Sequence, residues 1–338
     1  MMNDSALIEW LKLSVSEKSK IFNDVSEERG LPFASIEKDW WVTKTLSLIF
    51  SMTCADSLIF KGGTSLSKAW NIIERFSEDI DLVLDRDSLG FAGNLSNRQI
   101  HKLRYASYEF LTTQFTPELD AKFKEAGFTD VIVKPQDVIN HDQDPLIVEI
   151  YYPKLNEIDT YLRPGVLVEI GSRSLKEPNS LRNIQTMVGE MFNNKPFADK
   201  AISIPVVNPE RTFLEKVFLL HEEYQRPPEK MRVVRLSRHL YDIEKLSKTL
   251  FFEKALSNKE LYYTIVEHRN KFSHLQGVDY TKHSPEFIKI IPPAHVLPLW
   301  EKDYHEMAEN MIYGDKLTFG KLIKELKIIQ ASINDTKF

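Results

Sequence analysis

Residues 57–84 contain the pattern that most constrains how this chain folds. A short apolar run, Ser57–Phe60, leads into the glycine pair Gly62-Gly63, and a second apolar run spans 80–84. Short apolar runs bounded by glycine predict β-strands, and the glycine pair predicts a tight turn after the first strand. We expect a helix over 65–75 between the two strands. The pattern therefore predicts a strand, a turn, a helix and a strand in a mixed α+β protein.

Two acidic residues, Asp79 and Asp81, flank Ile80 in the second of these strands. Side chains alternate between the faces of a strand, so both carboxylates face one way while Ile80 and Leu82 face the core. Adjacent carboxylates repel each other unless a cation lies between them. Oxygen ligands of this kind suit Mg²⁺ or Mn²⁺. The alternative is a pair of surface acids on an edge strand, and the glycine turn just upstream favours the metal site.

The turn itself predicts a phosphate site. Gly62 and Gly63 allow the backbone to approach a ligand without interference from a Cβ atom. The start of the following helix would offer free N–H groups and positive dipole potential to a phosphate. A hydroxyl from Thr64 or Ser65 would add a further contact, and we favour Ser65. A glycine pair alone is more often only a turn.

Patterning over the rest of the chain divides it into a mixed region and a helical region. We expect helices over 5–52, with Ser35 as an N-cap, and over 97–127. Further strands are predicted at 131–134, 146–152, 166–170 and 202–207, and a helix is predicted from Pro209 to about Tyr224. The fold class is therefore α+β, with a mixed β-sheet flanked by helices over 1–207 and a mainly helical C-terminal domain over 208–338.

Composition limits the setting and the partners. The chain of 338 residues has a single cysteine, Cys54, which rules out an internal disulfide framework and suits a reducing cytosol. Without an apolar run of about 20 residues or a signal-peptide pattern, we expect a cytoplasmic protein with no membrane partner. Net charge is −5, yet Arg226–Lys248 is locally basic. That stretch could hold a polyanion, or it could be a solvated helix face.

The motif Gly62–Leu66 followed by Arg75–Leu82 resembles the signature of the AbiEii/AbiGii toxin family, in the DNA polymerase β-like nucleotidyltransferase superfamily. Four further segments are similar to the family in order and spacing: 37–42, 168–171, 209–216 and 238–242. The family includes toxins of AbiE-type toxin–antitoxin and phage-resistance systems, and MenT-type toxins that add nucleotides to tRNA acceptor ends. Two departures from its pattern are Thr64 directly after Gly63, and a glutamate at Glu169 where an aspartate is usual.

The resemblance implies roles for the acidic residues. Asp79 and Asp81 would be metal ligands. Glu169 would be the third ligand or the general base toward the acceptor hydroxyl. Glu149 lies in a similar apolar strand and is the rival, because burial in such a strand is costly for either carboxylate. Only the family context, Glu169-Ile-Gly, favours Glu169.

The resemblance also implies roles for residues outside the strands. Lys216 would offset the charge of the triphosphate, although a surface lysine with a partner in its own helix is the alternative. Asp242 would shape the active site, and its alternative is an ion pair with Arg238 one helical turn away. Arg75 would hold the strand of the acids or touch a phosphate.

These assignments predict a toxin that transfers a nucleoside monophosphate from an NTP to RNA, with a tRNA 3′ end as the acceptor and a cognate antitoxin as a partner. Charge rather than sequence reading would hold the RNA backbone. The residues predicted to contact RNA are Arg226, Lys230, Arg232, Arg235 and Arg238. A protein or small-molecule acceptor is one alternative, and a nonenzymatic nucleotide-sensing or partner-binding module is another.

Overall fold

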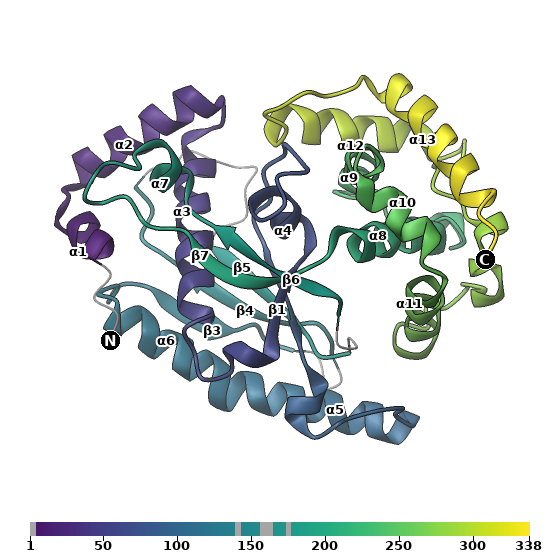
Figure 1. Ribbon diagram of the computed structural model, residues 1–338, viewed down its shortest axis with the longest axis horizontal. Coiled ribbons are helices and arrows are strands. Elements are labelled where there is room, and N and C mark those ends of the chain that lie inside the picture. The colour runs from purple at the N-terminus through teal and green to yellow at the C-terminus, as the bar shows by residue number, and fades with distance from the viewer. Residues whose placement is uncertain (1–4, 139–142, 156–164, 174–176) are drawn as a thin grey trace. The chain divides into compact units, whose positions relative to one another are not determined.

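The computed structural model describes residues 5–138, 143–155, 165–173 and 177–338, which form two compact units (Figure 1). The first unit comprises Met1–Ala69 and Phe76–Val206, and the second comprises Trp70–Arg75 and Val207–Phe338. The segment 70–75, which directly precedes the predicted acids, thus belongs with the C-terminal residues. Within the described residues, no helix is both long enough and apolar enough to cross a bilayer.

The first unit is built on a seven-stranded mixed sheet with the order β3-β4-β5-β2-β1-β7-β6. Its strands are β1 (Leu58–Lys61), β2 (Ile80–Leu84), β3 (Ile132–Pro135), β4 (Leu146–Tyr151), β5 (Val166–Gly171), β6 (Asn179–Ile184) and β7 (Ile202–Val207). Its helices are α1 (Ser5–Lys12), α2 (Val15–Arg29), α3 (Phe33–Ile49), α4 (Gly62–Lys68), α5 (Asn97–Phe110), α6 (Thr116–Glu125) and α7 (Met187–Met191). A π-helical turn, Leu111–Phe115, joins α5 to α6. The predicted α+β class is confirmed.

Alternation along β4 and β5 separates an apolar face of the sheet from a polar one. Every second residue from Leu146 and from Val166 is buried, whereas the intervening residues, which include Glu149 and Glu169, remain partly exposed. Helix α3 packs against β5, and α6 packs against β3 and α3. Because the hydrophobic residues of the strands are covered on one side, the acidic side chains are left on the other.

The second unit is helical. Its elements are α8 (Pro209–Glu223), α9 (Ser237–Ser247), α10 (Leu250–Ser257), α11 (Lys259–Phe272), α12 (Leu297–Asn310) and α13 (Phe319–Asn334). Helices α8 and α9 pack against each other; α10 and α11 contact α8, and α12 and α13 contact α9. Large side chains such as Trp300 and Tyr262 are fully buried among these helices. The expectation of a mainly helical C-terminal region is confirmed for the described residues.

Three local predictions were wrong or incomplete. Helix α4 covers Gly62–Lys68 rather than 65–75, so the glycines lie inside its first turn. Ser35 is not an N-cap, because α3 begins at Phe33, whose ring packs edge-on against Phe22 at 5.6 Å. Strand β6 was not predicted, since its sequence is polar and it lies at the edge of the sheet, where little of it needs to be buried.

Helix α3 is buried almost all round because α2, α6, α7 and β5 contact it. Trp40 and Trp41 are 3% and 7% exposed, and Trp40 stacks on Trp10 at 4.9 Å. They are core residues. Glu37 shares this environment: it lines a cavity of about 210 Å³ beside Trp10 and Phe128. Its carboxylate accepts a hydrogen bond from the Leu155 amide at 2.8 Å.

Glu37 is expected to make stability fall as pH rises. Burial raises its pKa from 4.5 to about 7, so the folded state holds a proton that the unfolded state releases. Stability then decreases between pH 4.5 and about 7. Glu37→Gln removes this loss, and we expect it to stabilise the protein by roughly 2–3 kcal/mol at pH 8 and by little at pH 4.5. Urea unfolding at both values measures this, and an equal effect at both would contradict it.

Candidate active site

Strand pairing brings Asp81 and Glu169 side by side. Strands β2 and β5 are parallel neighbours, and Asp81 is in register with Glu169. On its other side β2 pairs with β1, where Lys61 is opposite Asp81. Residues that are directly paired across strands share a face of the sheet. The polar face therefore carries a row of two carboxylates and one ammonium, contributed by β5, β2 and β1.

Asp79 directly precedes β2 and keeps the alternation predicted for it. Ile80 and Leu82 are fully buried, whereas Asp79 and Asp81 are partly exposed. The backbone of Asp79 is anchored, because its carbonyl accepts a hydrogen bond from the Thr64 hydroxyl of α4. The helix that follows the glycine pair thus fixes the start of the acidic strand.

Gly62 has a reason to be glycine that the sequence did not indicate. Its φ is +80°, in the left-handed region, and a Cβ atom added there would lie 1.8 Å from Oδ2 of Asp81. Any side chain at this position would occupy the space of the carboxylate. The glycine that was expected to admit a phosphate therefore admits Asp81, which lies against the first turn of α4.

The two hydroxyls of the turn point inward. Thr64 and Ser65 are both 0% exposed. Thr64 bonds to Asp79 as above and lies 3.0 Å from the hydroxyl of Ser77. Ser65 donates to the carbonyl of Gly62 at 2.9 Å. In this structure both hydroxyls therefore stabilise the turn from within, and a phosphate contact from Ser65 remains a prediction.

Glu149, the rival third carboxylate, lies farther from the pair of acids. It occupies β4, where Ile147 rather than Glu149 is in register with Glu169. Its carboxylate accepts a hydrogen bond from the Tyr151 hydroxyl at 2.9 Å and pairs with Lys134 at 3.6 Å. These contacts direct Glu149 toward the β3 edge. The register therefore favours Glu169 as the carboxylate beside Asp81.

The donor chemistry of this face fits a hard divalent cation. Mg²⁺ is usually held by one or two carboxylates together with waters and substrate phosphates, not by a cage made only of protein ligands. In the described ranges, no three His, Cys, Asp or Glu side chains are grouped closely enough to hold a metal ion. Asp79, Asp81 and Glu169 are therefore not gathered into a preformed three-ligand site in this structure.

A second cluster of buried charge lies within the helical unit. Arg75 donates to both carboxylate oxygens of Asp242, at 2.7 and 2.8 Å, and the Lys216 ammonium lies 2.8 Å from the same carboxylate. Arg75 and Asp242 are 1% and 0% exposed. Burial alone would raise the pKa of Asp242, but Arg75 and Lys216 hold it well below its usual range. The carboxylate is therefore ionised and is shared by the Arg75 guanidinium and the Lys216 ammonium.

These contacts give Lys216 and Arg75 a common partner, which bears on the roles predicted for both. The partner of Lys216 is Asp242 on α9, not a residue of its own helix. The guanidinium of Arg75 is buried against Asp242, and the suggestion that it touches a phosphate remains a prediction. A group that was not predicted, His239, lies 3.5 Å from Lys216 through Nδ1. Burial, followed by the charge of Lys216, lowers the pKa of His239 well below its usual value, which leaves a neutral ring.

Sequence reasoning passed over Lys61 and His239 for different reasons. Lys61 precedes the glycine pair and ends β1, so its pairing with Asp81 depends on a register that the sequence does not reveal. Its place next to the glycines was the available signal. His239 had no signal, because its role depends on a contact between α8 and α9.

The basic stretch Arg226–Lys248 is not one helix face. Its first part is a loop with a short 3₁₀ turn, Pro228–Lys230, and only the part from Ser237 is helical. Arg226 and Arg232 both bind the buried carboxylate of Glu223. Lys230 and Arg232 are nevertheless exposed, whereas Arg235 and Arg238 are partly buried. The cationic surface of the loop is therefore smaller than the sequence indicated.

Comparison with known proteins identifies the family. The chain is similar to JHP933 of Helicobacter pylori (15% identity, 90% of this chain and 93% of that one, TM-score 0.41). It is also similar to another solved structure from H. pylori, described as that of a putative nucleotidyltransferase (15% identity, 86% of this chain and 92% of that one, TM-score 0.39). No curated protein matches the sequence. The family described as nucleotidyl transferase AbiEii toxin, type IV TA system, matches residues 49–325. The chain therefore belongs to the AbiEii family of nucleotidyltransferase toxins.

Proposed function

We propose that this nucleotidyltransferase is metal-dependent and transfers a nucleoside monophosphate from an NTP to RNA, with a tRNA 3′ end as the acceptor. The family implies an NTP substrate and an antitoxin partner. The observation that supports the proposal best is the register of Asp81 with Glu169, next to Asp79 and with Gly62 leaving space for the Asp81 carboxylate. Carboxylates that lie next to each other on adjacent strands suit phosphoryl transfer.

In this proposal Asp79 and Asp81 hold Mg²⁺ or Mn²⁺. When bound, the cation would lower the pKa of the attacking hydroxyl and neutralise charge on the transferred phosphate. Glu169 either completes the ligand set or accepts the proton of that hydroxyl, because its register places it beside Asp81. Lys61, on the other side of Asp81, adds positive charge where phosphate oxygens would be held. Phosphate contacts from the backbone of Gly62 and Gly63 remain a prediction, beside the space that Gly62 leaves for the Asp81 carboxylate.

The proposed RNA contacts begin with the exposed pair Lys230 and Arg232. Both belong to a loop, and loops present charge to a flexible polyanion without a fixed groove. Arg226, Arg235 and Arg238 remain proposed contacts. Arg226 and Arg232 are both paired with Glu223, so an RNA phosphate would share these two side chains with that carboxylate. The role of Lys216 toward a triphosphate likewise remains a prediction, as does any part of Asp242 in shaping the nucleotide site.

One labelling experiment tests the reaction and its acceptor. The protein is incubated with each α-labelled NTP, Mg²⁺, total tRNA and, separately, soluble protein, beside an Asp81→Ala variant. We expect label in the tRNA fraction with at least one NTP, and a loss of about 10³-fold or more in the variant, because removing a metal ligand removes several kcal/mol of transition-state stabilisation.

The outcomes separate the alternatives. Label in protein but not in tRNA would favour a protein acceptor and overturn the RNA proposal. Label that persists at the wild-type rate in Asp81→Ala would overturn the site. No label in any fraction from a folded protein that binds Mg-NTP would instead support the nonenzymatic alternative.

A further inference from the structure

Helix α3 carries two consecutive charged residues, Lys38 and Asp39, that are buried although neither belongs to the acidic face of the sheet. The Lys38 ammonium lies 2.6 Å from Oε2 of Glu78, and both side chains are 1% exposed. Glu78 directly precedes Asp79. A fully buried ion pair thus connects α3 to the backbone that leads into the predicted metal ligands.

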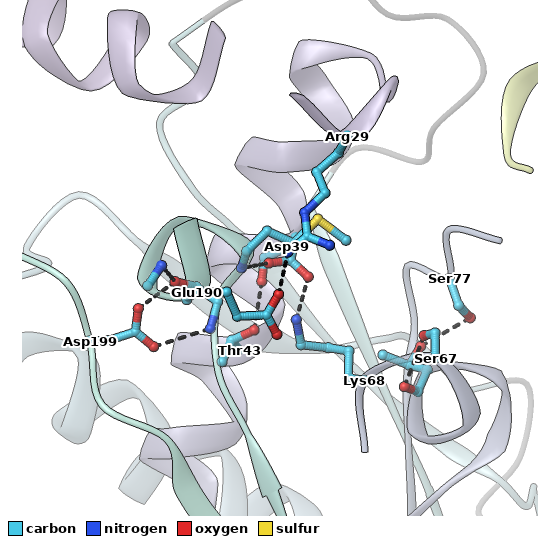
Figure 2. Close-up of polar contacts among 12 residues, drawn as sticks. Arg29, Asp39, Thr43, Ser67, Lys68, Ser77, Glu190 and Asp199 are labelled. Carbon is cyan, nitrogen blue, oxygen red and sulfur yellow. Dashed lines mark hydrogen bonds and ion pairs between the residues drawn. The ribbon is translucent and has the colours of Figure 1, made fainter. Parts of the chain in front are cut away.

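Asp39 connects α3 to helix α4, which begins at the glycine pair of the site. Its carboxylate is bound by the Lys68 ammonium, which comes from the last turn of α4, and it accepts a hydrogen bond from the Met187 amide at 2.8 Å. Figure 2 shows the Lys68 side chain reaching from α4 to Asp39. The pair is buried, with the Lys68 side chain 8% exposed and that of Asp39 3% exposed. Helix α4 is therefore held at its end by α3 and at its start by β1.

The two elements that α3 holds, helix α4 and the segment 78–81, are also bonded to each other. The Thr64 hydroxyl of α4 bonds to the Asp79 carbonyl, so α4 and the segment 78–81 also contact each other directly. Helix α3, helix α4 and the acidic segment form a closed triangle of polar contacts. Each corner is held by side chains that are almost completely buried, which leaves little freedom for any one corner to move alone.

Stability alone does not explain why charge is used here. A buried ion pair costs desolvation energy, and a neutral pair of similar volume is often as stable or more stable. What a neutral pair does not provide is the fixed distance and direction of a charged hydrogen bond. A metal site needs such precision, because its ligands must be held within a fraction of an ångström by the residues behind them.

We propose that Lys38 and Asp39 are positioning residues, which set the separation between α4 and the Asp79–Asp81 segment and so determine the affinity of the site for its divalent cation. The proposal rests on the metal dependence proposed above. Lys38 acts through Glu78, and Asp39 acts through Lys68; neither is a catalytic residue. It follows that the affinity for metal depends on ion pairs that do not touch the metal.

The test replaces each charged pair by a neutral pair of similar size. Lys38→Met with Glu78→Gln removes the first pair without leaving a buried charge, and Mn²⁺ alone is titrated while free Mn²⁺ is followed by electron paramagnetic resonance. We expect a melting temperature near that of the wild type and Mn²⁺ affinity at least about 10-fold weaker. Asp39→Asn with Lys68→Met, which keeps an oxygen for the Met187 amide, should act in the same way.

The matched control neutralises an exposed ion pair of the same unit. Lys12 and Glu9 of α1 are paired at 2.5 Å, with side chains 64% and 42% exposed, and Lys12→Gln with Glu9→Gln should leave the Mn²⁺ affinity unchanged. Wild-type affinity in a folded Lys38→Met/Glu78→Gln protein would overturn the proposal. If that variant does not fold, the Asp39–Lys68 pair decides by the same criterion.

A further variant separates this inference from the proposed function. Asp81→Ala defines the signal of a protein that lacks a metal ligand. If the wild type binds Mn²⁺ no better than Asp81→Ala, the metal site itself is wrong, and the positioning role falls with it. If the wild type binds well and both neutral pairs bind equally well, only the positioning role is wrong.

Discussion

Replacing Gly62 by alanine is expected to abolish nucleotidyl transfer, by about 10³-fold or more, although the change adds a single methyl group. The new Cβ would lie 1.8 Å from Oδ2 of Asp81, far inside contact distance. Either the carboxylate rotates away or α4 moves, and in both cases the ligand set loses its geometry. Because each 1.36 kcal/mol of lost transition-state stabilisation costs a factor of ten, the loss of one metal ligand accounts for this magnitude.

The control for Gly62→Ala must separate the clash from backbone strain. Gly30 serves this purpose, because its φ of +64° is also in the left-handed region while nothing lies within 4 Å of an added Cβ. Gly30→Ala should therefore cost only about 1 kcal/mol of stability and leave the activity intact. Transfer rates and Mn²⁺ affinity are measured for both variants. Wild-type transfer by Gly62→Ala would show that the Asp81 carboxylate does not act from this position.

Asp242→Asn is expected to have the largest effect on stability, about 3–5 kcal/mol of destabilisation. The neutral amide would leave Arg75 and Lys216 buried without the carboxylate that they share at 2.7–2.8 Å. Because its partners hold the pKa of Asp242 well below its ordinary value of 3.8, its contribution to stability is present above pH 3.8 and is lost as the pH falls below that value. Urea unfolding of the wild type and the variant at pH 7 measures the difference.

A second substitution shows whether unpaired charge causes the loss. Lys216→Met in the Asp242→Asn background removes one of the two stranded cations, so we expect it to recover part of the stability. In the wild-type background the same change leaves the Arg75–Asp242 pair intact. A cycle of the four proteins gives the coupling energy between residues 216 and 242. Additive effects would mean that the two side chains do not interact in the folded protein, contrary to their 2.8 Å separation.

Much of the first unit was predictable because local patterns and the sheet agree. Strand β2 was predicted at its observed bounds, since a short apolar run that alternates with acidic residues is compatible with few secondary structures other than a β-strand. The pair Asp79 and Asp81, on the face opposite Ile80 and Leu82, followed from the same alternation. The end of α4 was not predictable, because segment 70–75 has helical patterning but packs with the helical unit instead.

The sequence by itself determined which residue types stand together along the chain: the glycine turn, the two acids two positions apart, and the family to which this order belongs. Only the tertiary structure decided which side chains from separate parts of the chain lie next to each other. Strand register, which no local pattern specifies, placed Glu169 and Lys61 on either side of Asp81 and moved Glu149 away. Burial then turned Thr64 and Arg75 inward, because a buried polar group must find a partner, and their partners, Asp79 and Asp242, come from other segments of the chain.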